Sequence, residues 1–109
     1  MIAVIFEVEI KNQENKAQYF ERAAELKDIL LKMPGFISIE RFQSVASANR
    51  YLSLSFWQDE ASVKGWRQQM IHRAAQQQGR EQLFEDYRIR VANVMRDYGM
   101  TAREQAPDT

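Results

Sequence analysis

The sequence predicts an α+β protein in which four antiparallel strands form one sheet and two helices cover one of its faces. Three observations support this prediction. Apolar residues recur at every second position in four segments, they recur at helical spacing in two others, and the segments follow in the order β-α-β-β-α-β. Such a chain arranges its strands in the spatial order 4-1-3-2. With 109 residues, it is long enough for one domain with a single core.

The first strand and the first helix have clear periodic patterns. Residues 2–10 alternate between an apolar even-numbered face and an odd-numbered face that carries two glutamates. Residues 15–33 follow a helical period, and their inward face is expected to contain Phe20, Ala23, Leu26, Lys27 and Leu30. Pro34 and Gly35 should end this helix.

Three further strands are predicted after this helix. Residues 36–45 and 49–57 are joined by a short polar turn, which favours an antiparallel hairpin. Residues 84–98 alternate again and form the fourth strand. We therefore expect one domain over residues 1–98 and a polar tail over residues 99–109.

The two faces of the predicted sheet differ in what they need to pack against. If the first and fourth strands are neighbours, Glu7 and Glu9 can form ion pairs with Arg88 and Arg90 on one face. Two helices can cover only the other face. The uncovered face is expected to carry Ala3, Ile5, Ile37, Ile39, Ala92 and Val94. A second copy of the chain is the simplest cover for it, so we predict a homodimer.

The segment between the third and fourth strands carries the residues of greatest chemical interest. Asp59 is a good N-cap for a helix that should stop near Gly79. The inward face of this helix is expected to contain Val63, Trp66 and Met70. His72, the single histidine, follows Trp66 by six positions, which places the two on different faces of an unbroken helix.

Composition argues against several classes of partner. Fifteen basic residues balance fifteen acidic ones, so no net field would draw the protein to nucleic acid or to an anionic membrane. The chain has no cysteine and one histidine, which disfavours a permanent metal centre. The amino terminus lacks the features of a signal peptide, and no segment approaches the ~20 apolar residues of a membrane span. We expect a cytoplasmic protein.

A family resemblance follows from these residues. The strand end Ser55–Trp57, the acidic helix start at residues 59–60, Trp66, His72 and the closing strand over residues 87–98 resemble the antibiotic biosynthesis monooxygenase domain. The similarity covers roughly residues 1–98. It implies a ferredoxin-like fold of the dimeric α+β barrel type. The family includes cofactor-independent oxygenases of anthrone-like polyketides, haem-degrading monooxygenases and proteins of unknown role.

The resemblance disfavours the haem-degrading branch. Members of that branch use an asparagine on the first strand, a tryptophan on the second helix and a histidine as the iron ligand. Trp66 matches the tryptophan, but Phe6 stands at the strand position and Gln76 at the position of the ligand. Phenylalanine cannot hydrogen-bond to an iron-bound group, and glutamine is not a usual haem ligand.

The leading hypothesis is therefore a small monooxygenase that uses no metal and no organic cofactor. It would act on an anthrone-like or phenolic aromatic molecule and dioxygen in a cavity between the sheet and the helices. The candidate catalytic residues are His72, Trp66 and Asn93, and the candidate substrate-binding residues are Phe6, Leu30, Met70 and Arg80. His72 would serve as base or proton shuttle, and Asn93 or Arg80 would stabilise an oxyanion.

Each candidate also has a structural interpretation. A helical histidine such as His72 is often solvated, Trp66 has the spacing of a core residue, and Asn93 is typical of a satisfied core amide as well. Tyr51 and Trp57 share one strand face, which we assign to the pocket or, preferentially, to the dimer interface. The competing function is a non-enzymatic ligand-binding or stress-related dimer of the same fold. Haem degradation is the third alternative.

Overall fold

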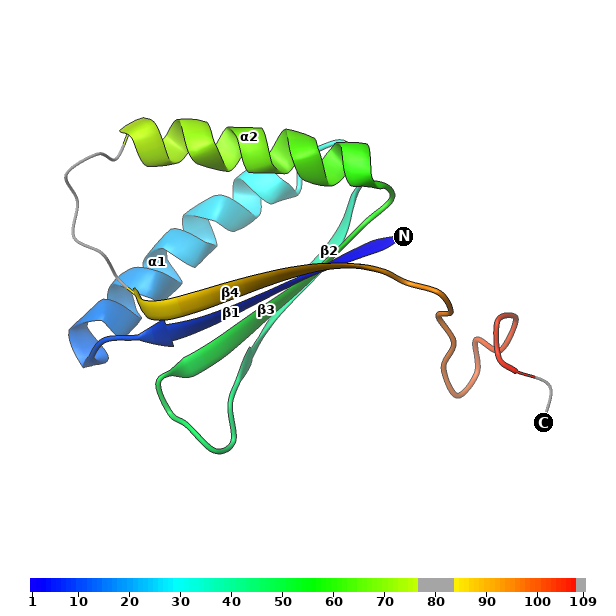
Figure 1. Ribbon diagram of the computed structural model, residues 1–109, viewed down its shortest axis with the longest axis horizontal. Coiled ribbons are helices and arrows are strands. Elements are labelled where there is room, and N and C mark those ends of the chain that lie inside the picture. The colour runs from blue at the N-terminus through cyan, green and yellow to red at the C-terminus, as the bar shows by residue number, and fades with distance from the viewer. Residues whose placement is uncertain (77–83, 108–109) are drawn as a thin grey trace.

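The computed structural model describes residues 1–76 and 84–107. Its elements in chain order are β1 (Ile2–Ile10), α1 (Gln13–Leu30), β2 (Phe36–Gln43), β3 (Arg50–Trp57), α2 (Glu60–Gln76) and β4 (Phe84–Asn93). The strands form an antiparallel sheet in the order β2-β3-β1-β4, with the segment after β4 extending away from it (Figure 1). The predicted α+β fold and strand order are confirmed. In the described part of the chain, no helix has the length and apolar character required to cross a membrane.

Element boundaries differ from prediction by a few residues for local reasons. α1 begins at Gln13 because the side chain of Asn12 caps it, with Oδ1 accepting the backbone N–H of Asn15 at 3.0 Å. The helix ends at Leu30, before the predicted stop. β4 likewise ends at Asn93 instead of residue 98.

The inward face of α1 is rotated from the predicted one. Tyr19, Ala23 and Leu30 are buried, whereas Phe20 is 42% exposed and Lys27 is exposed. The rings of both residues contact Tyr51 of β3, with centroids 5.7 Å away for Tyr19 and 5.2 Å for Phe20, but only Tyr19 is buried in the core beside β1. The core at this end of the molecule is formed by Val8, Ile10, Tyr19 and Tyr51.

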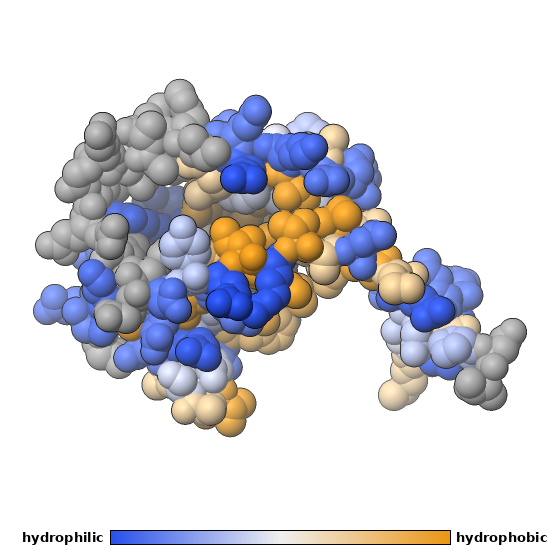
Figure 2. All heavy atoms as spheres, in the orientation of Figure 1, coloured by the Kyte–Doolittle hydropathy of each residue, from blue (hydrophilic) through white to orange (hydrophobic). Residues whose placement is uncertain are grey.

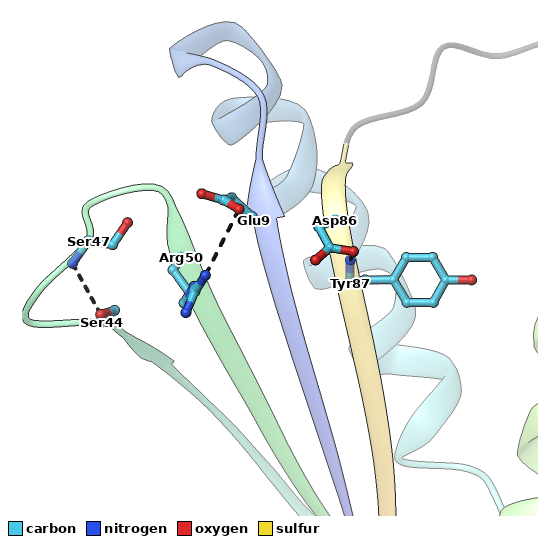
Figure 3. Close-up of polar contacts among 6 residues, drawn as sticks. All are labelled: Glu9, Ser44, Ser47, Arg50, Asp86 and Tyr87. Carbon is cyan, nitrogen blue, oxygen red and sulfur yellow. Dashed lines mark hydrogen bonds and ion pairs between the residues drawn. The ribbon is translucent and has the colours of Figure 1, made fainter.

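Ion pairs on the outer face of the sheet confirm part of the predicted charge matching. Glu7 pairs with Arg90 of β4 at 3.2 Å. Glu9 lies opposite Asp86 in the ladder and pairs instead with Arg50 of β3 at 4.0 Å, so its expected pair with a β4 arginine was wrong (Figure 3). All four of these side chains are well exposed, and each pair therefore contributes little to stability.

After a shift in the hairpin register, the residues of β2 face the sides of the sheet opposite to those predicted. The β2–β3 ladder shifts between Phe36 and Ser38, so that Ile39 lies opposite Ser55. Ile39 thereby points to the helix side of the sheet, and its predicted place on the outer face was wrong. A one-residue slip exchanges the two faces of a strand. Phe42, opposite Leu52, lies on the outer face instead.

The outer face of the sheet is apolar in its centre. It carries Ile5, Leu52, Leu54 and Phe56, which are half-buried, and Phe42, which is 43% exposed. Both helices contribute to the opposite side of the sheet. The homodimer remains a prediction, and this surface is the one that it would cover.

Candidate functional site

An open cavity of about 670 Å³ lies between the sheet and the two helices. Its apolar lining is formed by Val4, Phe6, Leu26, Leu30, Ile39, Val63, Trp66, Met70, Ile89 and Val91. Figure 2 shows apolar side chains gathered in the hollow between α2 and the sheet. Pockets for small organic ligands have volumes of roughly 300–1,000 Å³ and mostly apolar walls. The cavity therefore has the size and character of a site for a small apolar molecule.

Two stacked tryptophans form one side of this cavity. Trp57, at the end of β3, is 0% exposed and its indole Nε1–H donates to Ser55 Oγ at 3.0 Å. Its ring stacks on that of Trp66 of α2, with centroids 6.1 Å apart. Trp66 is half-buried and lines the cavity, so Trp57 is the support and Trp66 the wall. Placing Tyr51 and Trp57 preferentially in the dimer interface was wrong, because both face the helices and are buried there.

The start of α2 is fixed by two local contacts. Asp59 is the predicted N-cap, and its Oδ1 accepts the backbone N–H and the hydroxyl of Ser62 at 2.8 and 2.7 Å. These hydrogen bonds, the backbone one foremost, hold the pKa of the Asp59 carboxyl below its ordinary value. The backbone N–H of Gln58 donates to the carbonyl of Gly35 at 2.8 Å. Both contacts set the direction in which α2 leaves β3 and thereby the position of Trp66.

The structure brings together four of the predicted site residues. Phe6, Leu30, Trp66 and Met70 all line the cavity, although they come from β1, α1 and α2. Asn93 shares the helix-facing side of β4 but lies opposite Ile2 at the end of the ladder, where it is exposed and outside the cavity lining.

The remaining candidates are only partly described. His72 belongs to the helical backbone of α2, and its side chain lies outside the described residues. The same holds for the side chain of Gln76. Arg80 and the predicted helix stop at Gly79 lie wholly outside the described residues.

The polar part of the described lining consists of Arg22, Glu25, Arg41, Ser53, Ser55 and Arg67. None of its four charged residues was among the site residues predicted from the sequence. Arg41 was missed because the odd-numbered residues of β2 were assigned to the outer face. Its Nε is buried and has no hydrogen-bond partner among the described residues. No sequence pattern would have located it, because the shift in the β2–β3 ladder is what turns Arg41 toward the same side as Ser53.

The fold and the cavity define a small α+β protein with a largely apolar pocket between its sheet and its helices. Residues 1–78 match the protein family described as antibiotic biosynthesis monooxygenase. The chain belongs to this family. The resemblance found in the sequence is thereby confirmed.

One sequence relative and two solved structures place the chain further. The chain is 39% identical over 94 residues to a jasmonate monooxygenase from Pyricularia oryzae, a match that covers 86% of this chain but only 43% of the relative. The haem degrader MhuD from Mycobacterium tuberculosis has a TM-score of 0.70 at 18% identity and covers 91% of this chain and all of its own. SnoaB, a cofactor-independent oxygenase from Streptomyces nogalater, has a TM-score of 0.70 at 13% identity, with coverage of 88% and 94%. At these identities the two structures show the shared fold alone.

The described lining offers few ligands for haem iron, and the side chains of His72 and Gln76 lie outside the described residues. Haem iron in proteins is held by histidine, cysteine, tyrosine or methionine, the last usually together with histidine. Of these types the described lining contains Tyr19 and Met70. Tyr19 is 6% exposed, and its ring is packed against Tyr51. Among the described residues there is also no group of three His, Cys, Asp or Glu that could hold a metal ion.

Proposed function

We propose that this protein is a small monooxygenase that oxygenates an anthrone-like or phenolic aromatic substrate without a metal or an organic cofactor. The observation that carries the proposal is the apolar cavity of about 670 Å³, walled by Trp66 and floored by Phe6, in a chain of the antibiotic biosynthesis monooxygenase family. The description of SnoaB as a cofactor-independent oxygenase and of the fungal relative as a jasmonate monooxygenase supports this class of reaction.

The proposed reaction requires few catalytic groups from the protein. An anthrone-like substrate converts one CH₂ group and one dioxygen into a carbonyl group and water, so the substrate itself supplies all the electrons. The protein needs to hold the ring system, exclude water from it and remove the proton that creates the electron-rich anion. A largely apolar cavity performs the first two of these tasks.

The proposal gives a role to all but one of the candidate residues. Trp66 and Phe6 position the aromatic rings, and Leu30 and Met70 close the apolar wall around them. His72, two positions after Met70 on α2, acts as the base or proton shuttle. Of the two candidates for stabilising the oxyanion that develops during the reaction, Arg80 keeps this role and Asn93 does not, because Asn93 is exposed and outside the cavity lining.

The proposal extends to the working form of the protein. We assign the active form to a homodimer in the cytoplasm, because the outer face of the sheet offers a continuous apolar surface in Ile5, Leu52, Leu54 and Phe56. Its balanced charge, fifteen basic and fifteen acidic residues, gives no support to a nucleic-acid or membrane partner.

Oxygen consumption with an anthrone surrogate in metal-chelated buffer tests the proposal. Trp66→Ala should weaken substrate binding, and His72→Ala should slow turnover by about 10²- to 10⁴-fold because it removes general acid–base catalysis. Lys64→Ala, an exposed position on α2, is the control and should leave turnover unchanged. Equal turnover by the wild type and both site variants would remove the catalytic assignment.

One observation favours a second candidate function, a non-enzymatic ligand-binding or stress-related dimer. The cavity has the size and the apolar lining needed to bind a small molecule, and binding alone requires no catalytic group. If ligands bind in the cavity while oxygen consumption is absent, the second function replaces the first.

A further inference from the structure

We propose that Arg41 is the anion-recognition residue of the cavity, so that the preferred ligand is a small apolar molecule with one negatively charged oxygen group at its end. A carboxylate, a phenolate and an enolate share this chemistry. The inference rests on the proposed function only in that this ligand would be the substrate, since binding itself requires no turnover.

The sheet register places Arg41 at the polar end of the cavity floor. One row of paired residues crosses all four strands as Ile89, Phe6, Ser53 and Arg41, and the next row crosses as Val91, Val4, Ser55 and Ile39. Every one of these residues lines the cavity. The floor is thus apolar over β4 and β1 and becomes polar over β3 and β2. Three strand spacings separate the ends, roughly 14 Å, which is the length of a small fused-ring or long-chain acid.

In the described part of the chain, one N–H group of the Arg41 guanidinium is buried without a partner. Its Nε is buried, and no hydrogen-bond partner for this atom lies among the described residues. A buried N–H without a partner is unfavourable, and a guanidinium keeps its charge in a protein. An oxyanion seated at this end of the cavity would accept charge-assisted hydrogen bonds from the guanidinium of Arg41, whose side chain lines the cavity.

The other charged residues of the lining reinforce the preference for an anion. Arg22 and Arg67 line the cavity from α1 and α2, and Glu25 is the acidic residue that lines it with them. Among the described lining residues, three arginines against one glutamate make the local field positive. Glu25 and Arg67 are exposed, so solvent screens them more than Arg41. Arg22 is half-buried like Arg41, but among these described side chains only Arg41 has a buried nitrogen without a partner. Arg41 is therefore the residue that fixes the position of the ligand's charged group.

A matched pair of fluorescent dyes tests this inference without any reaction. The anionic dye 1-anilinonaphthalene-8-sulfonate and its uncharged parent N-phenyl-1-naphthylamine differ only by a sulfonate. Arg41→Met should weaken binding of the anionic dye roughly tenfold to hundredfold and leave the uncharged dye unchanged. Arg41→Lys, which keeps the charge, should restore part of the affinity. Lys27→Met removes the same charge from an exposed position outside the lining and should affect neither dye.

Further outcomes separate the possible failures. Trp66→Ala should weaken both dyes, which locates them in the cavity. If Arg41→Met weakens the binding of both dyes equally, Arg41 only shapes the cavity. If Arg41→Met and Arg41→Lys both bind the anionic dye as tightly as the wild type, the inference is also wrong. If Arg41→Met does not fold, Arg41→Gln replaces it as the test. A preference of Arg41→Gln for the anionic dye over the uncharged dye that equals the wild-type preference would contradict the inference. Selective binding of the anion without oxygen consumption would refute the proposed function and leave the role of Arg41 standing.

Discussion

The two stacked tryptophans should separate stability from ligand binding when each is replaced by alanine. Their rings lie 6.1 Å apart, yet Trp57 is 0% exposed while Trp66 is half-buried and borders the cavity. Trp57→Ala should therefore act mainly on folding. Trp66→Ala should act mainly on the ligand, because its outer surface contacts whatever fills the cavity.

The expected magnitudes follow from what each indole contacts. Trp57→Ala removes a fully buried ring, its edge-on contact with Phe36 at 5.3 Å and its hydrogen bond to Ser55. Truncations of this kind lower the free energy of unfolding by about 3–5 kcal/mol. Trp66→Ala removes a half-buried ring and the stacking contact, for a loss of about 1–2 kcal/mol. It should also raise the Kd of the uncharged naphthylamine dye about tenfold or more, since an aromatic wall is lost.

Urea unfolding followed by far-UV circular dichroism measures the first quantity, and dye fluorescence measures the second. All variants need the same protein concentration, because the stability of a dimer depends on concentration. The double variant gives the coupling between the rings, which should be about 0.5–1.5 kcal/mol. If Trp66→Ala costs as much stability as Trp57→Ala and leaves dye binding intact, Trp66 is an ordinary core residue and the assigned pocket wall is wrong.

Three further predictions concern assembly, haem and pH. Light scattering at micromolar concentration should give about twice the 12.8 kDa of one chain, because the apolar outer face of the sheet needs a cover; a mass near one chain contradicts the homodimer. Purified protein should be colourless and bind haemin weakly; a sharp Soret shift that saturates at one equivalent and disappears in His72→Ala would reverse this conclusion. Asp59→Ala should be less stable than the wild type at neutral pH. The pKa of Asp59 is lowered from 3.8 in the folded protein, so its contribution is full above that value and is lost as pH falls through the lower folded pKa. A difference between the two unfolding curves that stays constant down to pH 2 would contradict the N-cap role.

The fold was predictable because the apolar residues of this sequence recur with the period of a strand or of a helix in each element. The even-numbered residues of β1 do face the helices, as their apolar alternation indicates. The choice between Tyr19 and Phe20 for the inward face of α1 could not be made in this way, since two adjacent aromatic residues fit the pattern almost equally. Both rings contact Tyr51, and Tyr19 is the one that joins the buried cluster with Val8 and Ile10, which are distant in the sequence. The prediction of which β2 residues face the helices was wrong after the ladder shift beside Phe36, because the alternation of apolar residues gives no sign of a bulge.

The apolar half of the candidate site was predictable and the polar half was not. Phe6, Leu30, Trp66 and Met70 are large apolar residues on inward faces, so the period that places the elements also places them. Arg41 lies on a strand that alternates apolar and charged residues, and a charged residue there is ordinarily assigned to solvent. Only the pairing of β2 with β3 brings it into the cavity.

Adjacent rows of the sheet show how one set of strands can serve two purposes. The row Arg90, Ile5, Leu54 and Glu40 faces outward, with charges at its two edges and apolar side chains in its centre. An apolar centre with a charged rim is the usual anatomy of a surface that pairs with a copy of itself. The neighbouring inward row has its apolar side chains at one end and Arg41 at the other, so its two ends differ in character. A row of this kind does not match an inverted copy of itself, but it can align a molecule that is apolar at one end and anionic at the other. A substrate held by its charged end against β2 would present its apolar rings to Phe6 and Trp66. The surface that the predicted homodimer would cover and the proposed binding surface therefore lie one residue apart along the same strands.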